Sequence, residues 1–392
     1  MARKAYVYID DIPKKVTKAY VGIGNVASKI RKAYIGIGGV ARPCWGGILS
    51  YYGKITDLSV GRRFLAATTV GDYALFGGGS AGDNYYANVD AYNSSLTRTI
   101  AEDLKIARCY LAATTVDDYA LFGGGYNPAD TSTIYTGYIR DVTAYNSSLT
   151  RATISTSLWF PKSNLSATTV GNYAIFAGGA YRSDATGALV GFGGIDVYSS
   201  SLVNIGHMNQ RHELVLTRKK RNLAATTVGN YAIFAGGYAS DSSLTPYNDA
   251  DAFDSSLTHT IPQGLDVARR FLAATTVGNY ALFAGGQDSS SKQDAVDIYD
   301  SSLTKLTSQK LSRVRSWLAA TTVGDYALFA GGNTGGVRKI VDAFDSSLTH
   351  TIAEELSVAR ESFAATTIDK YALFAGGKTG DNYTSTVEAY TI

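Results

Sequence analysis

A basic side chain recurs at a fixed distance before each copy of a repeated A/S-A-T-T motif. It lies four positions before the motif in every copy, at Arg62, Arg108, Lys162, Lys220, Arg269, Arg315 and Arg360. An acid recurs later in each copy, at Asp90, Asp196, Asp251, Asp297, Asp342 and Glu388, except that Thr143 stands there in the second copy. Such a basic ring could hold an anionic polymer, or each cation could bond loop carbonyls and an acid of a neighbouring unit. The regularity favours the second, structural interpretation, because a binding site usually departs from symmetry.

The segments that follow the glycine pair of each copy do depart from symmetry. They are longest in the second, third and fourth copies, at residues 126–138, 180–194 and 238–248, and they are rich in Tyr, Asp and Ser. Divergent loops on a rigid scaffold commonly carry binding residues, and tyrosine offers stacking area and a hydroxyl to sugars and protein surfaces. The alternative is that these are tolerated insertions. The candidate ligand-binding residues are Tyr126, Asn127, Asp130, Tyr135, Tyr138, Tyr181, Arg182, Asp184, Tyr238, Asp241, Tyr247 and Asn248.

Signals for catalysis, metals and cofactors are weak. The four histidines are His207 and His212, which share one insertion, and His259 and His350, which occupy equivalent SSLTHT turns. No pair has convincing zinc-ligand spacing, and no glycine-rich segment matches a phosphate-binding loop. The near-identity of LAATTV in all copies argues against a catalytic set on that segment. We therefore expect no enzyme activity, no metal and no cofactor.

The element that positions all these residues is a repeat of the type LAATTVGNYALFAGG. It occurs seven times, starting at Leu65, Leu111, Leu165, Leu223, Leu272, Leu318 and Phe363. One unit, residues 272–316, divides into four short strands: LAATTV, YALFAGG, AVDIYD and a less regular fourth. Seven such units without helical periodicity predict an all-β, seven-bladed β-propeller. The small first strand should lie nearest the axis, and the variable loops and the fourth-to-first loops should emerge on one face.

The ends of the chain predict how the ring closes and where it is anchored. The chain stops at a third strand, VEAYTI, and residues 52–60 match the fourth strand of other units. These residues should complete the last blade, since an open ring leaves unpaired edges. The propeller then spans residues 48–392. Residues 1–47 hold three copies of a 14-residue hairpin repeat, with Tyr6, Tyr20 and Tyr34 in phase and turns at residues 10–11, 24–25 and 38–39. So little chain buries little core, so we expect this segment to dock on the propeller, on other copies or in an assembly.

Charge and cysteine content limit the partners and the cellular environment that the chain can be expected to have. Residues 1–45 carry nine Lys/Arg against two acids, a net +7, and the rest carries −4 of the total +3. Two cysteines, Cys44 and Cys109, make no disulfide framework, and we expect Cys109 to be a free buried thiol. The basic runs KKVTKAY and TRKKRN favour a solvated face or an acidic protein partner over nucleic acid. No apolar run has membrane-spanning length, and the N-terminus lacks a signal-peptide pattern, so we expect synthesis in a cytoplasm and no membrane insertion.

Two resemblances follow from these motifs. The glycine doublet after an aromatic strand, the acidic-aromatic third strand and the Arg before the next unit resemble kelch repeats. The kelch tryptophan is absent, and a leucine stands near its place, at Leu96, Leu149, Leu257, Leu303 and Leu348. The segment KAYIGIGGVARPCW resembles N-terminal segments of virion and tail-associated proteins of phages and prophages of Gram-positive bacteria.

Together the resemblances imply a phage virion structural, decoration or tail protein that displays its propeller to the host surface. Residues 1–47 would bind other virion proteins, and the loops of blades two to four would bind a bacterial glycan or protein. A homo-oligomer is possible, and the sequence does not separate head from tail. The alternatives are a cellular kelch-like protein-interaction module and a propeller glycoside hydrolase.

Overall fold

The computed structural model describes residues 48–131, 134–182, 188–206, 214–239 and 244–392 in full. It also describes the backbone of residues 207–208 and of six strands between residues 6 and 45. Those six strands pair as three antiparallel hairpins: β1 (Tyr6–Ile9) with β2 (Ile12–Lys15), β3 (Tyr20–Ile23) with β4 (Val26–Lys29), and β5 (Ala33–Ile37) with β6 (Val40–Trp45). The three turns, and the side chains of Tyr6, Tyr20, Tyr34 and Cys44, lie outside the described residues.

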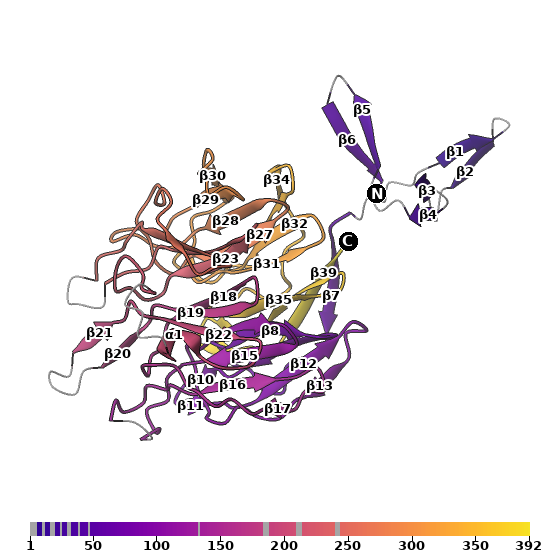
Figure 1. Cartoon of the computed structure of the whole chain (residues 1–392). Coiled ribbons are helices and arrows are strands. Elements are labelled where there is room, and N and C mark those ends of the chain that lie inside the picture. Colours follow the sequence, from indigo (N-terminus) through magenta and orange to yellow (C-terminus); the bar gives the residue numbers. More distant parts are fainter. Residues whose placement is uncertain are drawn as a thin grey trace.

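Residues 50–392 form seven antiparallel sheets arranged as the blades of a propeller (Figure 1). The first strands are β8 (Ala66–Val70), β14 (Ala112–Val116), β18 (Ser166–Val170), β23 (Ala224–Val228), β27 (Ala273–Val277), β31 (Ala319–Val323) and β35 (Ala364–Ile368). The second strands are β9 (Tyr73–Gly77), β15 (Tyr119–Gly123), β19 (Tyr173–Ala177), β24 (Tyr231–Ala235), β28 (Tyr280–Ala284), β32 (Tyr326–Ala330) and β36 (Tyr371–Ala375). The all-β, seven-bladed architecture is as the repeat predicts.

The outer half of each blade is less uniform. The third strands are β12 (Val89–Asn93), β16 (Val142–Tyr145), β22 (Ile195–Ser199), β25 (Ala250–Asp254), β29 (Ala295–Asp300), β33 (Val341–Asp345) and β39 (Val387–Thr391). The fourth strands are β13 (Arg98–Ile100), β17 (Arg151–Ala152), β26 (His259–Thr260), β30 (Gln309–Lys310), β34 (His350–Ile352) and, in the last blade, β7 (Ser50–Ile55). Blade 3 is a three-stranded sheet, and a short helix, α1 (Ile205–Met208), packs against its β22.

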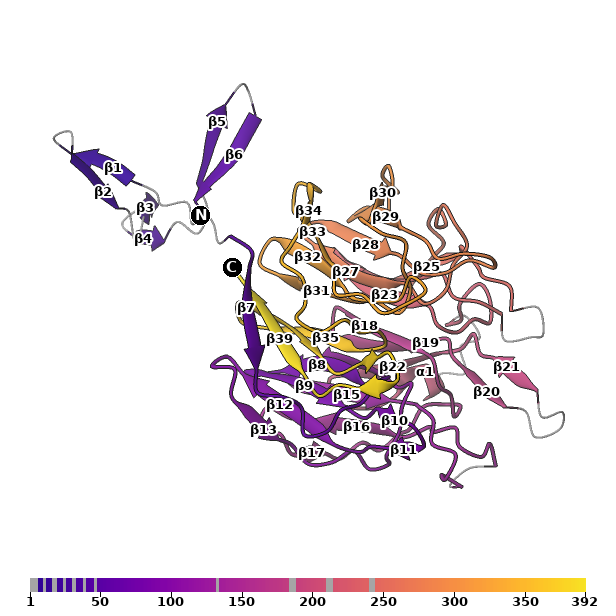
Figure 2. The same cartoon turned by 180° about the vertical axis from the view of Figure 1, so that it is seen from behind.

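The last blade joins the two ends of the propeller. Its strand β39 pairs with β7, from Val387 opposite Ile55 to Thr391 opposite Ser50 (Figure 2). The closing strand is therefore residues 50–55 rather than 52–60. The chain leaves the sheet after Ile55, and Leu58 turns into the core, where its backbone N–H donates to Ser385 O at 2.8 Å.

The first strands line the axis because their side chains are small. First strands of adjacent blades contact one another, and β35 contacts β8 to close the ring. Threonine hydroxyls bridge adjacent first strands, as between Thr68 and Thr115 at 2.7 Å and between Thr275 and Thr322 at 2.8 Å. The large side chains lie further out. Leu75 of blade 1 and Phe122 of blade 2 share one core cluster, so the space between blades is filled as predicted.

Short two-stranded hairpins follow the second strands of blades 1, 3 and 7. They are β10 (Ser80–Ala81) with β11 (Asn84–Tyr85), β20 (Ala180–Arg182) with β21 (Leu189–Gly191), and β37 (Lys378–Thr379) with β38 (Asn382–Tyr383). Backbone bridges join the first residue of these loops to the loop before the first strand, as between Arg63 and Ser80. Both sets of loops thus lie at one end of the propeller, which we call the loop face.

Candidate functional site

The basic ring lies inside the blades and away from the channel mouth. All seven side chains are fully buried, and six make an ion pair with the recurrent acid of the third strand in the same blade. Arg62 to Asp90 is 2.8 Å, and Arg315 to Asp342 is 2.6 Å. The acid belongs to the blade that the basic residue precedes, and not to a neighbouring blade. This geometry fits the structural interpretation, because a fully buried cation cannot meet a polymer at the mouth.

Blade 2 replaces the missing acid with one from two residues earlier. Asp141 accepts hydrogen bonds from Arg108 at 2.9 Å and from the Thr143 hydroxyl at 2.8 Å. Thr143 in turn accepts from Arg108 at 3.1 Å. The buried guanidinium is therefore balanced in this blade too, as the cost of an unpaired buried charge requires.

An aromatic-lined groove lies on the loop face where blades 2 and 3 meet. It has a volume of about 570 Å³ and is lined by Ile134, Tyr135, Arg140, Ser157, Trp159, Phe160 and Pro161. Ile134 is 74% exposed and Trp159 is 49% exposed. The volume falls within the usual range of about 300–1,000 Å³ for ligand pockets. We call this site the groove.

The walls of the groove are held by ring-to-ring contacts between the two blades. The Phe160 ring centroid lies 5.0 Å from that of Tyr135, 4.7 Å from that of Tyr181 and 5.5 Å from that of Phe192. The Lys162 ammonium lies over the Phe192 ring, 4.6 Å from its centroid. Contacts of this kind fix the aromatic faces before any ligand arrives.

The structure brings only some of the predicted loop residues to the groove. Tyr135 and Tyr181 join its aromatic cluster, and the exposed Arg182 adjoins Tyr181. Asn127 and Asn248 instead donate side-chain hydrogen bonds to the carbonyls of Ala107 and Leu265. Asn127 also orders the turn that contains Asp130, because its backbone carbonyl accepts from the Asp130 N–H and its Oδ1 accepts from the Ala129 N–H. Asp184 and Asp241 lie outside the described residues.

The remaining predicted tyrosines lie nearer the axis or on blade 4. Tyr126 packs against Tyr138 with centroids 5.1 Å apart, and Tyr138 is buried. Tyr247 lies under the Arg218 guanidinium at 5.0 Å. The buried Tyr238 lies between two guanidinium groups, those of Arg221 and Arg270. Among the predicted residues that the structure describes, Tyr135 lines the groove and none lines the cavity at the mouth of the channel.

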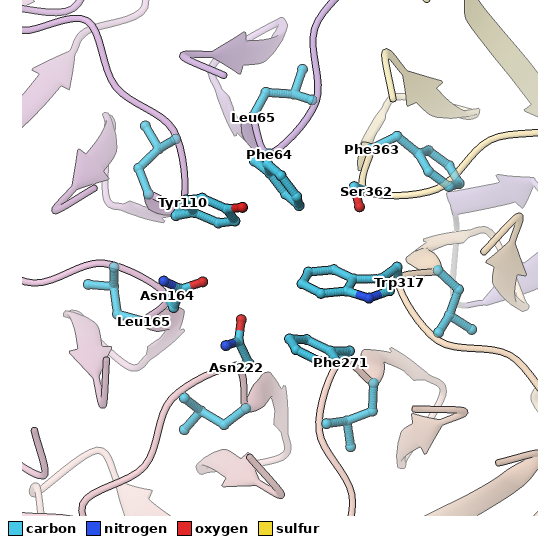
Figure 3. Close-up of a pocket in the computed structure, with 14 residues that line it drawn as sticks. Phe64, Leu65, Tyr110, Asn164, Leu165, Asn222, Phe271, Trp317, Ser362 and Phe363 are labelled. Carbon is cyan, nitrogen blue, oxygen red and sulfur yellow. The ribbon is translucent and has the colours of Figure 1, made fainter. Parts of the chain in front are cut away.

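The mouth of the channel is lined by one residue from each blade, which we call the axial ring. Figure 3 shows these side chains pointing towards the axis around a cavity of about 190 Å³. The axial ring consists of Phe64, Tyr110, Asn164, Asn222, Phe271, Trp317 and Ser362. Phe271 stacks on Trp317 with ring centroids 3.8 Å apart, and Phe64 packs against Tyr110 in a tilted arrangement at 4.1 Å. Phe64 also lies 5.6 Å from Trp317, so the four rings form one connected group. The amides of Asn164 and Asn222 lie side by side next to this group.

A belt of backbone hydrogen bonds holds the axial ring. Each residue donates its N–H to the carbonyl of the axial residue in the preceding blade, with N···O distances of 2.9–3.2 Å, and Phe64 donates to Ser362 to close the circle. All seven residues have φ between 53° and 59°. Asn tolerates this left-handed conformation, whereas aromatic residues rarely adopt it. The backbone conformation therefore does not explain why aromatic residues occupy Phe64, Tyr110, Phe271 and Trp317.

The histidines act as structural groups where the structure describes their contacts. His259 and His350 stack on Phe253 and Phe344 at 4.6 and 4.7 Å and hydrogen-bond to the buried carboxylates of Asp251 and Asp342. His212 lies outside the described residues. Within the described part of the chain, no three His, Cys, Asp or Glu side chains group closely enough to hold a metal ion. The described residues also include no helix long and apolar enough to cross a membrane.

Sequence reasoning missed both the axial ring and half of the groove. The letter before LAATTV reads F, Y, N, N, F, W, S in successive copies, which is variation beside a near-invariant segment. The groove residues Trp159 and Phe160 lie between a recurrent buried leucine, here Leu158, and Lys162 of the basic ring. Other copies have small or polar residues at most of these positions, as in LSVAR, so column-by-column comparison would have found both signals.

Comparison with known proteins supports the fold and nothing finer. No family model matches the chain, and no curated protein matches it. Among solved structures, one entitled "Structure of YjhT" superimposes with a TM-score of 0.55 at 14% sequence identity, covering 86% of this chain and 97% of that one. At this identity the likeness concerns the propeller architecture alone.

Proposed function

We propose that this protein is a non-catalytic component of a phage virion, on the head or the tail, that presents its propeller to the bacterial surface and binds glycan there. The single observation that supports glycan binding is the groove. Its aromatic faces are exposed, partly preformed and accompanied by the polar groups of Arg140 and Ser157. Aromatic faces with nearby polar groups suit sugar rings, which have apolar C–H faces and hydroxyl edges.

Equivalent backbone bridges at the base of two loops allow one loop to replace the other, which removes the groove and keeps the bridge. Tyr126 pairs with Tyr138 in blade 2, and Gln287 pairs with Lys292 in blade 5, by equivalent isolated bridges. Replacing residues 126–138 by the six residues of 287–292 therefore keeps the bridge and deletes Ile134 and Tyr135. The matched control inserts the same six residues, 287–292, into blade 6. There they replace residues 333–337, which are joined by a bridge between Asn333 and Val337.

The assay is binding of the labelled full chain to cells of candidate Gram-positive hosts and to their purified wall glycans. We expect the blade 2 replacement to lose most binding and the blade 6 replacement to retain it, with unchanged melting temperatures. Equal binding by both variants would refute the proposal that the groove binds the glycan. Loss of the signal after protease treatment of the cells, but not after removal of glycan, would favour the alternative of a protein-interaction module. Release of sugar from the glycan would favour the hydrolase alternative.

Virion assembly is a separate part of the proposal and has its own test. Residues 1–47 would attach the protein to other virion proteins, and a homo-oligomer could form there. Purified particles should contain the full chain and lack a chain without residues 1–47, and antibody labelling in negative stain should place it on head or tail. Particles without the full chain would contradict the virion assignment while leaving the glycan assay interpretable.

A further inference from the structure

The channel mouth combines aromatic faces, amides and cations that the groove does not use. The axial ring offers two aromatic pairs, one stacked and one tilted, and the amides of Asn164 and Asn222 beside them (Figure 3). Its cavity of about 190 Å³ equals roughly six waters at about 30 Å³ each. This is smaller than the range of about 300–1,000 Å³ for drug-sized ligands, so the cavity admits about one small ring.

Three arginines lie next to residues of the axial ring, outside the lining of the cavity itself, and we call them the mouth arginines. Arg63, Arg221 and Arg270 each directly precede a residue of the axial ring. The Arg63 guanidinium carbon lies 4.5 Å from the Phe64 centroid, and that of Arg270 lies 5.2 Å from the Phe271 centroid. The four remaining blades have Cys109, Ser163, Ser316 and Glu361 at this position, so three cations face one anion.

The mouth arginines differ from the basic ring in lacking an acid. Among the described residues, none of the three guanidinium groups makes an ion pair, whereas every residue of the basic ring makes one. The buried Nε atom of each mouth arginine has no hydrogen-bond partner, as is also the case for four arginines of the basic ring. Two of them contact the same ring, since Arg221 and Arg270 lie 4.5 and 4.3 Å from the Tyr238 centroid. Burial lowers the pKa of Arg221 and the nearby Arg270 lowers it further, against the opposing effect of Tyr238 and Tyr138. Two close cations without a counter-ion are a site that an anion would stabilise.

We propose that the channel mouth binds one anionic sugar unit, a pyranose ring that carries a carboxylate or a phosphate. The ring would stack on the aromatic pairs of the axial ring, its hydroxyls would bond the two asparagine amides, and its anionic group would contact the mouth arginines. Planar guanidinium groups hold carboxylates and phosphates through charge-assisted hydrogen bonds. This inference is independent of the groove, because the two sites share no residue.

The axial ring supplies a variant that removes an aromatic face without disturbing its backbone. Asparagine already occupies the same left-handed position in blades 3 and 4, with φ of 58° and 53°. Trp317→Asn should therefore keep the hydrogen-bonded belt and lose the stacking surface. Arg221→Gln with Arg270→Gln removes two mouth arginines. Lys370→Gln is the control for loss of a surface cation away from the mouth, since Lys370 lies exposed in the turn at the far end of β35.

The test is isothermal titration of the full-length chain with glucuronate and glucose 6-phosphate, and with glucose and adenosine monophosphate as comparisons. We expect saturable binding of at least one of the two anionic sugars and at least about tenfold weaker binding of glucose. We also expect about a tenfold loss in the Arg221→Gln/Arg270→Gln and Trp317→Asn chains, with Lys370→Gln unchanged. No binding of either anionic sugar at millimolar concentration would overturn the proposal. So would equal binding of glucose, equal losses in Lys370→Gln, or a preference for adenosine monophosphate.

Discussion

Removing one acid behind the basic ring should destabilise the whole propeller by an amount that can be worked out. In blade 6, Asp342 accepts hydrogen bonds from Arg315 at 2.6 Å, from the Ser312 backbone at 2.8 Å and from His350 at 2.6 Å, and both charged side chains of the ion pair are fully buried. Asp342→Thr leaves Arg315 without a counter-ion. Breaking a buried pair in this way costs about 3–5 kcal/mol.

The size of the propeller converts this cost into a modest shift in melting temperature. The unfolding entropy near 60 °C is about 2.1 cal/mol/K per residue, so about 345 residues give about 0.7 kcal/mol/K, and the melting temperature should fall by about 4–7 °C. Calorimetry and circular dichroism of the full chain would measure the shift.

Blade 2 provides the matched rescue for this variant. There a threonine already stands at the equivalent position, and Asp141, two residues earlier, pairs with Arg108 at 2.9 Å. Ile340 is the residue equivalent to Asp141 in blade 6, so Asp342→Thr combined with Ile340→Asp rebuilds the arrangement of blade 2. We expect the double variant to recover more than half of the lost stability. A single variant within about 1 °C of the wild type, or a double variant no more stable than the single one, would refute the bracing role.

Three further outcomes follow from the structure. Burial raises the pKa of Asp251, but hydrogen bonds from its partners and the charge of the paired lysine outweigh burial and hold this pKa well below the usual range. The stability that the carboxylate contributes is therefore complete above its unfolded-state pKa of about 3.9 and is lost as the pH falls below that value. Thermal melts of Asp251→Asn should accordingly vary less between pH 6 and pH 3 than those of the wild type. Burial raises the pKa of Cys109 to about 12, so in a Cys44→Ser chain a thiol reagent at pH 8 should react only after unfolding, and rapid reaction of the folded chain would contradict this. Deleting residues 1–47 should leave the melting temperature of the propeller unchanged, whereas deleting residues 1–55 removes β7 and exposes the edge of β39, which should lower the melting temperature and cause aggregation in size-exclusion chromatography.

The blades were predictable because each unit repeats the same local sequence signals. Alternation, the Gly278-Asn279 type of turn and the glycine pair recur seven times, so an error in one copy is corrected by the others. The closing strand was predictable because the last unit lacks a fourth strand, although its bounds shifted to residues 50–55. A structural role for the basic ring was favoured from its regularity, whereas the pairing with an acid of the same blade was not predicted.

The candidate site was only partly predictable, because some of its residues are of types that do not usually adopt the backbone conformation found there. A left-handed φ normally indicates glycine or asparagine, so conformational rules pointed away from Phe271 and Trp317, and only comparison of the seven copies at that position marks them. The belt that fixes them is made of backbone groups from all seven blades, and such long-range bonds leave no local signal. Tyrosine content pointed to the loop face, but Phe160, which joins Tyr135 to Tyr181, comes from a different loop.

The central claim, that the loop face at blades 2 and 3 binds host glycan, is tested most directly by a point variant in the groove. Trp159 is 49% exposed there, and Phe160 beside it fixes the aromatic cluster. Equilibrium binding of the full chain to purified host wall glycan should weaken by about tenfold or more in Trp159→Ala, with the melting temperature unchanged. Binding of Trp159→Ala that equals the wild type, to a glycan that the wild type demonstrably binds, would contradict the assignment of the groove as the binding site.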